Sequence, residues 1–236
     1  MARILITGSN SGFGLLSTLT LARQGHDVIA TMRNPAKSDA LDDAVATEGL
    51  SVTKRTLDVA DQASVDAALT DAGDIDVLIN NAGYEVQSSV EQLADDLMYD
   101  QLETNVMGLV RVTHKVVENM VSRNRGHIVN IGSIAGIQPY ATGTIYSGSK
   151  HAVHGFSESL RLDYAGTGIR VTEILPGLVR TDFAMTRWND DVKAAAFYDQ
   201  TEQCLTPEDI AETVVFALEQ PPHVVLSQMV VLPSSG

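Results

Sequence analysis

Tyr146 and Lys150 stand four residues apart at the start of a segment, about 144–165, whose pattern predicts a helix. Residues at this spacing share one face of a helix, so the phenol and the ammonium should point in the same direction. A neighbouring cation favours the phenolate and lowers the pKa of a tyrosine from its usual value of about 10. Tyr146 is therefore a candidate general acid or base for interconverting an alcohol and a carbonyl compound.

Ser133 precedes Tyr146 by thirteen residues, at the carboxyl end of a predicted buried strand. A hydroxyl in that place can hold a substrate oxygen by a hydrogen bond. A tyrosine and a lysine at this spacing also occur by chance. The interpretation therefore depends on their combination with Ser133 and with a glycine-rich loop near the N-terminus.

That loop reads Thr-Gly-Ser-Asn-Ser-Gly-Phe-Gly over residues 7–14, between the first predicted strand and the first predicted helix. Gly8 permits a tight turn, Gly12 lets the backbone approach a pyrophosphate, and Gly14 lets the helix pack closely on the strand. The anion would lie at the positive end of the helix. An ordinary turn between strand and helix is the alternative, but the placement favours a dinucleotide site.

The second predicted strand ends at Met32 and Arg33, without the carboxylate that binds an adenosine 2′-hydroxyl in the simple dinucleotide fingerprint. A guanidinium can form two hydrogen bonds to a 2′-phosphate, and no anion repels the phosphate here. Arg33 therefore favours NADP, with NAD possible. The alternative is that Arg33 is simply an exposed loop residue.

The elements that must position these residues alternate along the whole chain. Strands are predicted at about 3–7, 28–31, 51–57, 76–80, 126–131, 169–175 and 224–231, and helices at about 12–24, 37–48, 61–72, 94–122, 144–165 and 207–219. Strands that are apolar throughout are buried on both faces, which indicates a parallel sheet covered by helices. The expected fold is α/β, a doubly wound, Rossmann-like parallel sheet in a single domain, 1–236. The least regular segment, about 178–206, is expected to form a substrate lid.

Composition excludes several other classes of protein. The chain has 236 residues, 44% of them hydrophobic, with 30 acidic and 16 basic side chains and a net charge of −14. This balance excludes disorder, and no Lys/Arg cluster points to nucleic acid or an anionic membrane. No apolar run reaches the ~18 residues of a membrane helix, and the N-terminus lacks a signal-peptide profile. One cysteine excludes an internal disulfide framework, so we expect a cytoplasmic protein.

Further motifs occur in a fixed order along nearly the whole chain, and together they carry a family resemblance. The seven motifs are the glycine loop, Asp58-Val59, Asn80-Asn81-Ala82-Gly83, Asn105, Ser133, Tyr146-x-x-x-Lys150 and Pro176-Gly177 with Thr181. In this set and order the chain resembles a short-chain dehydrogenase/reductase of the single-domain branch. The resemblance implies an NAD(P)-dependent oxidoreductase that interconverts a secondary alcohol and a ketone or aldehyde by direct hydride transfer, with no metal.

The resemblance also implies roles for individual residues. The implied catalytic set is Asn105, Ser133, Tyr146 and Lys150. Ser133 would orient the carbonyl group, Tyr146 would exchange the proton, and Lys150 would hold the nicotinamide ribose and lower the Tyr146 pKa. Asn105 would bind a water that links Lys150 to solvent. The implied cofactor-binding set is Gly8, Ser11, Gly12, Phe13, Gly14, Arg33, Asp58, Val59, Asn81, Ala82, Gly83, Tyr146, Lys150, Pro176, Gly177, Val179 and Thr181.

Substrate and assembly are less determined by the sequence. The candidate pocket residues, which follow strand ends or lie in the expected lid, are Tyr84, Gln138, Tyr140, Met185 and Trp188. The C-terminal segment is loosely similar to NADP-dependent 3-hydroxy acid or serine dehydrogenases, which is one alternative. A non-catalytic nucleotide sensor on the same fold is a more remote one, and a lyase or dehalogenase on this scaffold is another. The family resemblance implies a homodimer or homotetramer formed through the helices around 95–122 and 145–165.

Overall fold

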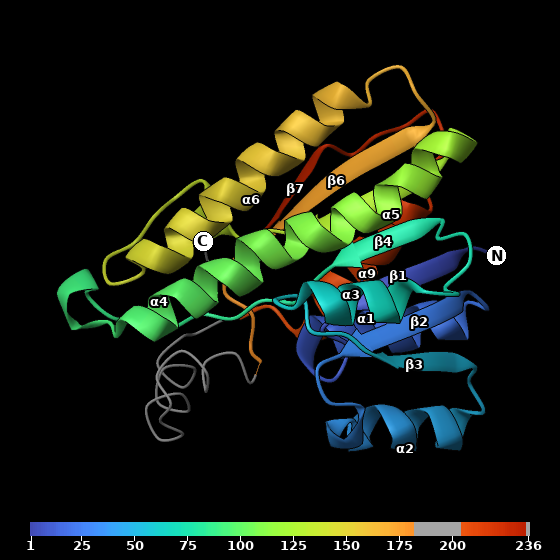
Figure 1. Cartoon of the computed structure of the whole chain (residues 1–236), viewed down its shortest axis with the longest axis horizontal. Coiled ribbons are helices and arrows are strands. Elements are labelled where there is room, and N and C mark those ends of the chain that lie inside the picture. The colour runs from blue at the N-terminus through green and yellow to red at the C-terminus, as the bar shows by residue number, and fades with distance from the viewer. Residues whose placement is uncertain (182–203, 235–236) are drawn as a thin grey trace.

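Parallel strands form one sheet at the centre of the computed structural model, which describes residues 1–181 and 204–234 (Figure 1). The strand order is β3-β2-β1-β4-β5-β6-β7. Their bounds are β1 (Arg3–Thr7), β2 (Asp27–Met32), β3 (Val52–Thr56), β4 (Val77–Asn80), β5 (Gly126–Ile131), β6 (Ile169–Pro176) and β7 (Gln228–Val231). The chain winds outward from β1 to β3 and then from β4 to β7. The predicted doubly wound α/β fold is therefore confirmed.

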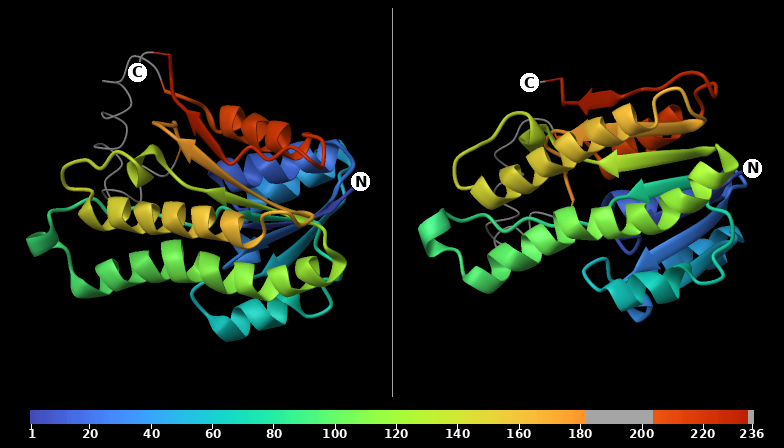
Figure 2. Two further views of the ribbon diagram at one scale, coloured as in Figure 1. Left: turned by 90° about the horizontal axis from the view of Figure 1, so that it is seen from above. Right: turned by 45° about the horizontal axis from the view of Figure 1, so that its top comes forward.

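Helices cover both faces of the sheet (Figure 2). On one face lie α1 (Gly12–Arg23), α2 (Asp39–Glu48) and α9 (Pro207–Leu218). On the other lie α3 (Gln62–Leu69), α5 (Leu109–Arg123) and α6 (Thr144–Asp163). In continuation of α5, α4 (Asp95–Leu102) extends beyond the sheet beside the start of α6 (Figure 1). Short 3-10 turns are η1 (Pro35–Lys37), η2 (Val90–Gln92) and η4 (Ile134–Gly136).

The interior strands are buried on both faces of the sheet, which explains why their sequences are apolar throughout. In β1, Ile4 and Ile6 pack toward α1 and α9, whereas Leu5 packs toward α3, α5 and α6. All three are fully buried. The edge strands differ, and β3 is largely exposed. The strand β7 begins at Gln228 rather than near Val224, where Val224 N instead donates to Pro221 O in a turn.

A π-helical turn, η3 (Glu103–Gly108), interrupts the single helix expected over 94–122. Gly108 packs against Val59 so closely that a Cβ at Gly108 would lie 2.5 Å from Val59 Cγ2. Asn105 lies within the wider turn and is 2% exposed. Wider turns of this kind are frequent at functional sites, and this one lies beside the carboxyl end of β4.

Candidate active site

The loop after β1 has the backbone that its glycines allow. Gly8 and Gly12 have φ values of +70° and +53°, in the left-handed region that side chains disfavour. A Cβ at Gly14 would lie 2.1 Å from Gly8 O and 2.5 Å from Asn81 Nδ2, so only glycine fits there. The loop is thereby folded tightly against the start of α1 and the residues after β4.

Thr7 ties this loop to the neighbouring strand end, a role that the sequence did not reveal. Its Oγ1 accepts hydrogen bonds from the backbone N–H groups of Asn81 and Ala82, both at 3.0 Å. The Asn81 side-chain amide donates in turn to Thr7 O and Gly8 O. The ends of β1 and β4 are therefore bound together where the strand order reverses, the usual ligand position in doubly wound sheets.

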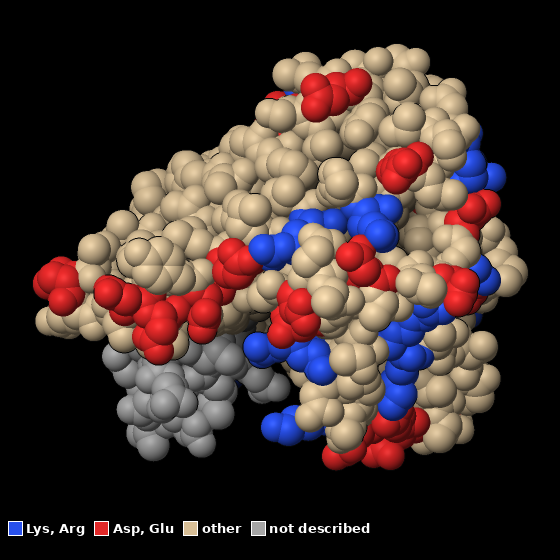
Figure 3. Space-filling view, in the orientation of Figure 1, with Lys and Arg blue, Asp and Glu red and all other residues tan. Residues whose placement is uncertain are grey.

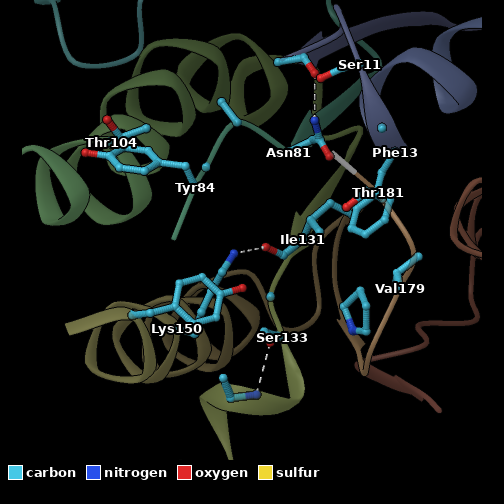
Figure 4. A pocket seen from close by; sticks show the side chains of 18 of the residues that line it. Ser11, Phe13, Asn81, Tyr84, Thr104, Ile131, Ser133, Lys150, Val179 and Thr181 are labelled. Carbon is cyan, nitrogen blue, oxygen red and sulfur yellow. Dashed lines mark hydrogen bonds between the residues drawn. The ribbon is translucent and has the colours of Figure 1, made fainter. Parts of the chain in front are cut away.

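One cleft of about 670 Å³ runs along the carboxyl ends of the strands. Of the predicted site residues it is lined by Gly8, Ser11, Gly12, Phe13, Arg33, Asp58, Val59, Asn81, Ala82, Gly83, Ser133, Tyr146, Lys150, Pro176, Gly177, Val179 and Thr181. Figure 4 places Ser11 and Asn81 at one end and Ser133 and Lys150 at the other. Gly14 and Asn105 are not among the lining residues, because both are packed behind the surface of the cleft.

At the far end, Lys150 lies beneath the ring of Tyr146. Its Nζ is 5.8 Å from the ring centroid and donates a 2.8 Å hydrogen bond to Ile131 O (Figure 4). Tyr146 and Lys150 are 7% and 8% exposed. Burial lowers the pKa of Lys150 to about 8, while the carboxylates of Glu173 and Glu85 oppose this shift by favouring the ammonium. An ammonium whose pKa lies not far above neutral pH therefore adjoins the Tyr146 phenol.

Ser133 is the N-cap of η4 and lies at the same end of the cleft. Its Oγ accepts a 3.1 Å hydrogen bond from Ala135 N, so its own O–H is the group that can donate to a ligand. Ser133 is 9% exposed. A hydroxyl donor, a phenol and an ammonium thus converge on one region, where they could hold a carbonyl oxygen and exchange a proton with it.

The side chain of Asn105 forms hydrogen bonds with other residues of the protein. Its amide nitrogen donates to Tyr84 O and Ser149 Oγ, and its Oδ1 accepts from Tyr84 N at 3.0 Å. It thereby fixes the loop after β4 against α6 and the π-helical turn. The expected link from Asn105 through a water to Lys150 stays a prediction.

Behind the cleft, Glu173 of β6 is a charged group that the sequence did not single out. It is 1% exposed, and its Oε2 lies 2.7 Å from His154 Nδ1. Burial raises the pKa of Glu173, and His154 and Lys150 oppose that rise. A Cβ at Gly132 would lie 2.5 Å from Glu173 Oε1, so the glycine that follows β5 makes room for the carboxylate.

Other cleft residues were also missed. They are Asn10, Leu57, Gln87, Thr104, Ile131, Gly132, Ile134 and Ala135. Several directly follow strand ends, which is a signal that could have found them. Of the predicted substrate residues, Tyr84 and Tyr140 line the cleft, whereas Gln138 is exposed and does not. Met185 and Trp188 lie outside the described residues.

Most of the expected lid, about 178–206, lies outside the described residues. Its two ends are described and pair with each other: Leu205 N donates to Leu178 O, and Arg180 N donates to Leu205 O. Val179 and Thr181 line the cleft. The segment therefore starts and ends at the cleft.

The loop end of the cleft fits a dinucleotide. Ser11 precedes α1 without a side-chain capping bond, so the first N–H groups of the helix lack that partner and can bind an anion. A Cβ at Gly12 would meet only Thr181 Cγ2, at 3.9 Å, so the loop surface is open to a ligand. Arg33 lines the same region and is exposed.

Comparison with known proteins shows which family the chain belongs to. The family model for short chain dehydrogenases matches residues 2–192. The chain belongs to the short-chain dehydrogenase family. A relative within this family, the NADP-dependent 3-hydroxy acid dehydrogenase YdfG of Salmonella typhi, is 40% identical over 242 residues, covering 98% of this chain and 94% of that protein. An NADP-dependent 3-hydroxy acid dehydrogenase of Schizosaccharomyces pombe is 35% identical, covering 98% and 92%.

Solved structures of short-chain dehydrogenases agree in fold. The closed form of a serine dehydrogenase complexed with NADP+ has a TM-score of 0.93 and 38% identity, covering 99% of this chain and 96% of that one. An actinorhodin polyketide ketoreductase variant with NADPH has a TM-score of 0.85 and 33% identity, covering 98% and 95%. Within the described part of this short-chain dehydrogenase, no helix has the length and apolarity needed to cross a membrane.

Proposed function

We propose that this short-chain dehydrogenase is an NADP(H)-dependent oxidoreductase that interconverts a secondary alcohol and a ketone or aldehyde. The observation that carries the proposal is the cleft itself, which brings Ser133, Tyr146 and Lys150 to one end and an open glycine loop to the other. The relatives whose names and structures include NADP support the choice of cofactor.

The loop end would hold the cofactor. The N-terminus of α1, at Gly12 and Phe13, would bind the pyrophosphate, and Arg33 would bind the 2′-phosphate. Asp58, which lines the cleft, would accept a hydrogen bond from the adenine amino group. Lys150 would hold the nicotinamide ribose. When bound, the cofactor supplies or accepts a hydride at the substrate carbon.

The catalytic end of the cleft would transfer the proton between Tyr146 and the substrate oxygen. Ser133 donates a hydrogen bond to the substrate oxygen and orients it. In reduction, the Tyr146 hydroxyl gives its proton to that oxygen, and in oxidation its phenolate takes the proton back. The Lys150 ammonium favours the phenolate form. Asn105 acts as a positioning residue, since it holds the Tyr84 backbone and Ser149.

Replacement of Tyr146 tests the proposal. Tyr146→Phe keeps the ring but removes the exchangeable proton, so turnover with NADPH and a panel of ketones should fall by about 10² to 10⁴-fold. Loss of the reduced-nicotinamide absorbance measures the rate. Tyr99→Phe, at a tyrosine that is 64% exposed, is the matched control. Unchanged turnover in Tyr146→Phe would refute the assignment, and NADPH binding without turnover by the natural chain would favour the sensor alternative.

A second candidate is narrower: the alcohol is a 3-hydroxy acid or serine. The similarity over nearly the whole chain to proteins with these names supports it. Parallel assays of 3-hydroxybutyrate, serine and uncharged secondary alcohols with NADP+ distinguish the two candidates.

Assembly and location complete the proposal. The outer faces of α5 and α6 expose Val121 and Leu162, which are 50% and 65% exposed. We expect these helices to join copies of the chain into a homodimer or homotetramer in the cytoplasm, with the segment 178–206 closing over the substrate. Light scattering of the purified chain measures the assembly.

A further inference from the structure

The guanidinium of Arg111, on α5, binds two segments of the chain that are far apart in the sequence. Its Nη1 donates a 3.3 Å hydrogen bond to Val59 O, in the turn after β3. Its Nη2 donates to Glu103 Oε1, at the start of the π-helical turn η3. The Arg111 side chain is 21% exposed. A guanidinium carries several donors in one rigid plane, so it can hold two acceptors at a fixed separation.

Val59 is also held by the packing of its side chain. A Cβ at Gly108, the last residue of η3, would lie 2.5 Å from Val59 Cγ2 and 3.2 Å from Val59 O. Glycine at this position therefore lets the helix approach Val59 closely. Arg111 follows Gly108 by three residues, a spacing that places both on one face of the helix. The side chain and the carbonyl of Val59 are thus both fixed against this face.

Each acceptor of Arg111 belongs to a segment that lines the cleft. Val59 lines it together with Asp58, and Thr104 lines it directly after Glu103 in the sequence. The turn after β3 and the π-helical turn are therefore two parts of the cleft wall, and Arg111 joins them from behind.

We propose that Arg111 is a positioning residue for the adenine of NADP(H): it fixes the turn that carries Asp58 against the π-helical turn that carries Thr104. The inference rests on the proposed NADP(H)-dependent function and assigns a further residue to the adenine end of the cleft. Arg111 acts on the cofactor through the Val59 peptide and not by a contact of its own.

The direction of the Asp58 carboxylate depends on this turn. Asp58 Oδ1 accepts from Ala60 N at 3.0 Å, and Asp58 N donates to Ser64 Oγ of α3 at 2.9 Å. These bonds orient Asp58 relative to α3, and the bond from Arg111 to Val59 O adds the link to α5. A hydrogen bond weakens steeply when its donor and acceptor are misaligned. A shift of the turn would therefore weaken the bond to the adenine amino group more than the rest of the cofactor's contacts.

A second ion pair on α5 provides a matched control. Figure 3 shows acidic side chains along α4 and basic side chains over the adjoining part of α5. Lys115 Nζ, on α5, lies 2.7 Å from Asp66 Oδ1 of α3. This pair joins two helices, as the charges of Arg111 and Glu103 join two segments, but neither of its members lines the cleft. Loss of the Lys115 charge should therefore leave adenine binding unchanged.

Deamino-NADPH, in which an oxygen replaces the adenine amino group, tests the inference by binding alone. The analogue cannot donate to Asp58, so the natural chain should bind NADPH about tenfold more tightly than the analogue. Nicotinamide fluorescence measures both dissociation constants. The shorter side chain of Arg111→Gln cannot bridge the two segments. This variant should weaken NADPH binding by about threefold to tenfold and reduce the preference for NADPH to about threefold or less. Lys115→Gln should keep the natural preference.

Two milder variants keep the test valid if Arg111→Gln does not fold. Arg111→Lys keeps the charge but replaces the planar set of donors with one ammonium, so its preference should lie between those of the natural chain and Arg111→Gln. Glu103→Gln removes the charge that holds the guanidinium in place, so the preference should fall by a smaller factor. Thermal unfolding without cofactor shows whether each variant is folded.

The ratio of the two dissociation constants separates positioning from a merely structural role. A structural role for Arg111 would weaken the binding of NADPH and of deamino-NADPH by the same factor, so their ratio would not change. An unchanged ratio in the folded Arg111 variants would overturn the inference, as would equal binding of the two cofactors by the natural chain.

The proposed function is judged by other measurements. If the natural chain binds NADPH and reduces ketones while the ratio does not respond to Arg111, the function stands and the inference falls. If the natural chain does not bind NADPH, both are refuted.

Discussion

The ammonium of Lys150 is almost removed from water, and its surroundings decide how long it stays charged as the pH rises. Burial lowers its pKa to about 8, and Glu173 is the larger of the two opposing influences. Lys150 is charged below this pKa and neutral above it. A reaction that needs the cation is therefore supported at low pH and loses that support as the pH rises through about 8.

Glu173→Gln should move this loss to lower pH. The variant keeps the size of the side chain but removes the charge that favours the ammonium, so the pKa of Lys150 falls further. The alkaline limb of the pH profile of kcat/KM for reduction should shift downward, while the rate at about pH 6 changes little. Glu158→Gln, on the exposed side of α6, is the control. A profile that coincides with that of the natural chain would show that Glu173 does not act on Lys150.

Arg33 is the residue on which cofactor choice is predicted to depend. Arg33→Asp exchanges the cation for a group that repels a 2′-phosphate and can accept from a 2′-hydroxyl. The ratio of kcat/KM for NADPH to that for NADH should fall, by about tenfold or more, since a hydrogen-bonded charge pair is lost. Arg125→Asp, at a side chain that is 68% exposed, is the matched control. An unchanged cofactor ratio would mean that another residue reads the 2′-phosphate.

At the scale of elements, β1, α1 and the loop after β4 pack so closely at their junction that no side chain fits at Gly14. Gly14→Ala would bring a methyl group against Gly8 O and Asn81 Nδ2. Overpacking of this kind costs about 1–3 kcal/mol, and the displaced loop should also bind NADPH more weakly. Thermal unfolding with and without NADPH measures both effects. Gly155→Ala, at an exposed glycine of α6 with open space around it, should leave NADPH binding unchanged; equal behaviour of the two variants would contradict the packing argument.

Elements that are determined by residues close together in the sequence could be predicted from it. The interior strands are apolar on both faces. The glycines determine the conformation of their loop, and the four-residue spacing places Tyr146 and Lys150 on one face of a helix. The π-helical turn could not be predicted, because it depends on the contact of Gly108 with Val59 and on the bonds between Asn105 and Tyr84. The hydrogen bond from Tyr140 to Glu85, 55 residues apart, was also missed, since nothing near either residue in sequence indicates the other.

At the scale of the whole molecule, parallel strands place every carboxyl end at one edge of the sheet. For this reason motifs spread from Gly8 to Thr181 line one cleft, and their order along the chain was enough to predict most of its lining. The same order could not predict which strands lie at the edges with exposed faces, as β3 and β7 do, since exposure depends on what the remaining chain covers.

His127, near the start of the interior strand β5, links the stability of the molecule to pH. It is 3% exposed, with Nε2 2.9 Å from Thr172 Oγ1, and burial with a smaller effect of Arg170 lowers its pKa to about 3. The unfolded chain, with the ordinary value of 6.5, therefore binds a proton between these pH values that the folded chain does not. The stabilising contribution of neutral His127 is complete above pH 6.5 and is lost progressively as the pH falls toward 3.

His127→Gln should flatten this dependence, because glutamine does not titrate. Between about pH 7.5 and pH 5, the natural chain should lose about 2 kcal/mol more than the variant in its free energy of unfolding. Urea denaturation at the two pH values gives the difference. His114→Gln, at an exposed histidine, should keep the natural dependence. Parallel stability curves for the natural chain and His127→Gln would exclude His127 as the source.

The π-helical turn also limits how the chain can change in length. A π-helical turn accommodates one residue more than an α-helical turn, so deletion of a single residue between Glu103 and Gly108 could restore an unbroken α-helix. Because the wider turn absorbs the extra residue, α4 and α5 would keep nearly the same relative phase, and only the turn that carries Asn105 would change. Asn105 would turn away from Tyr84 even though every other side chain were retained. At this point the number of residues, and not only their identity, preserves the wall of the cleft.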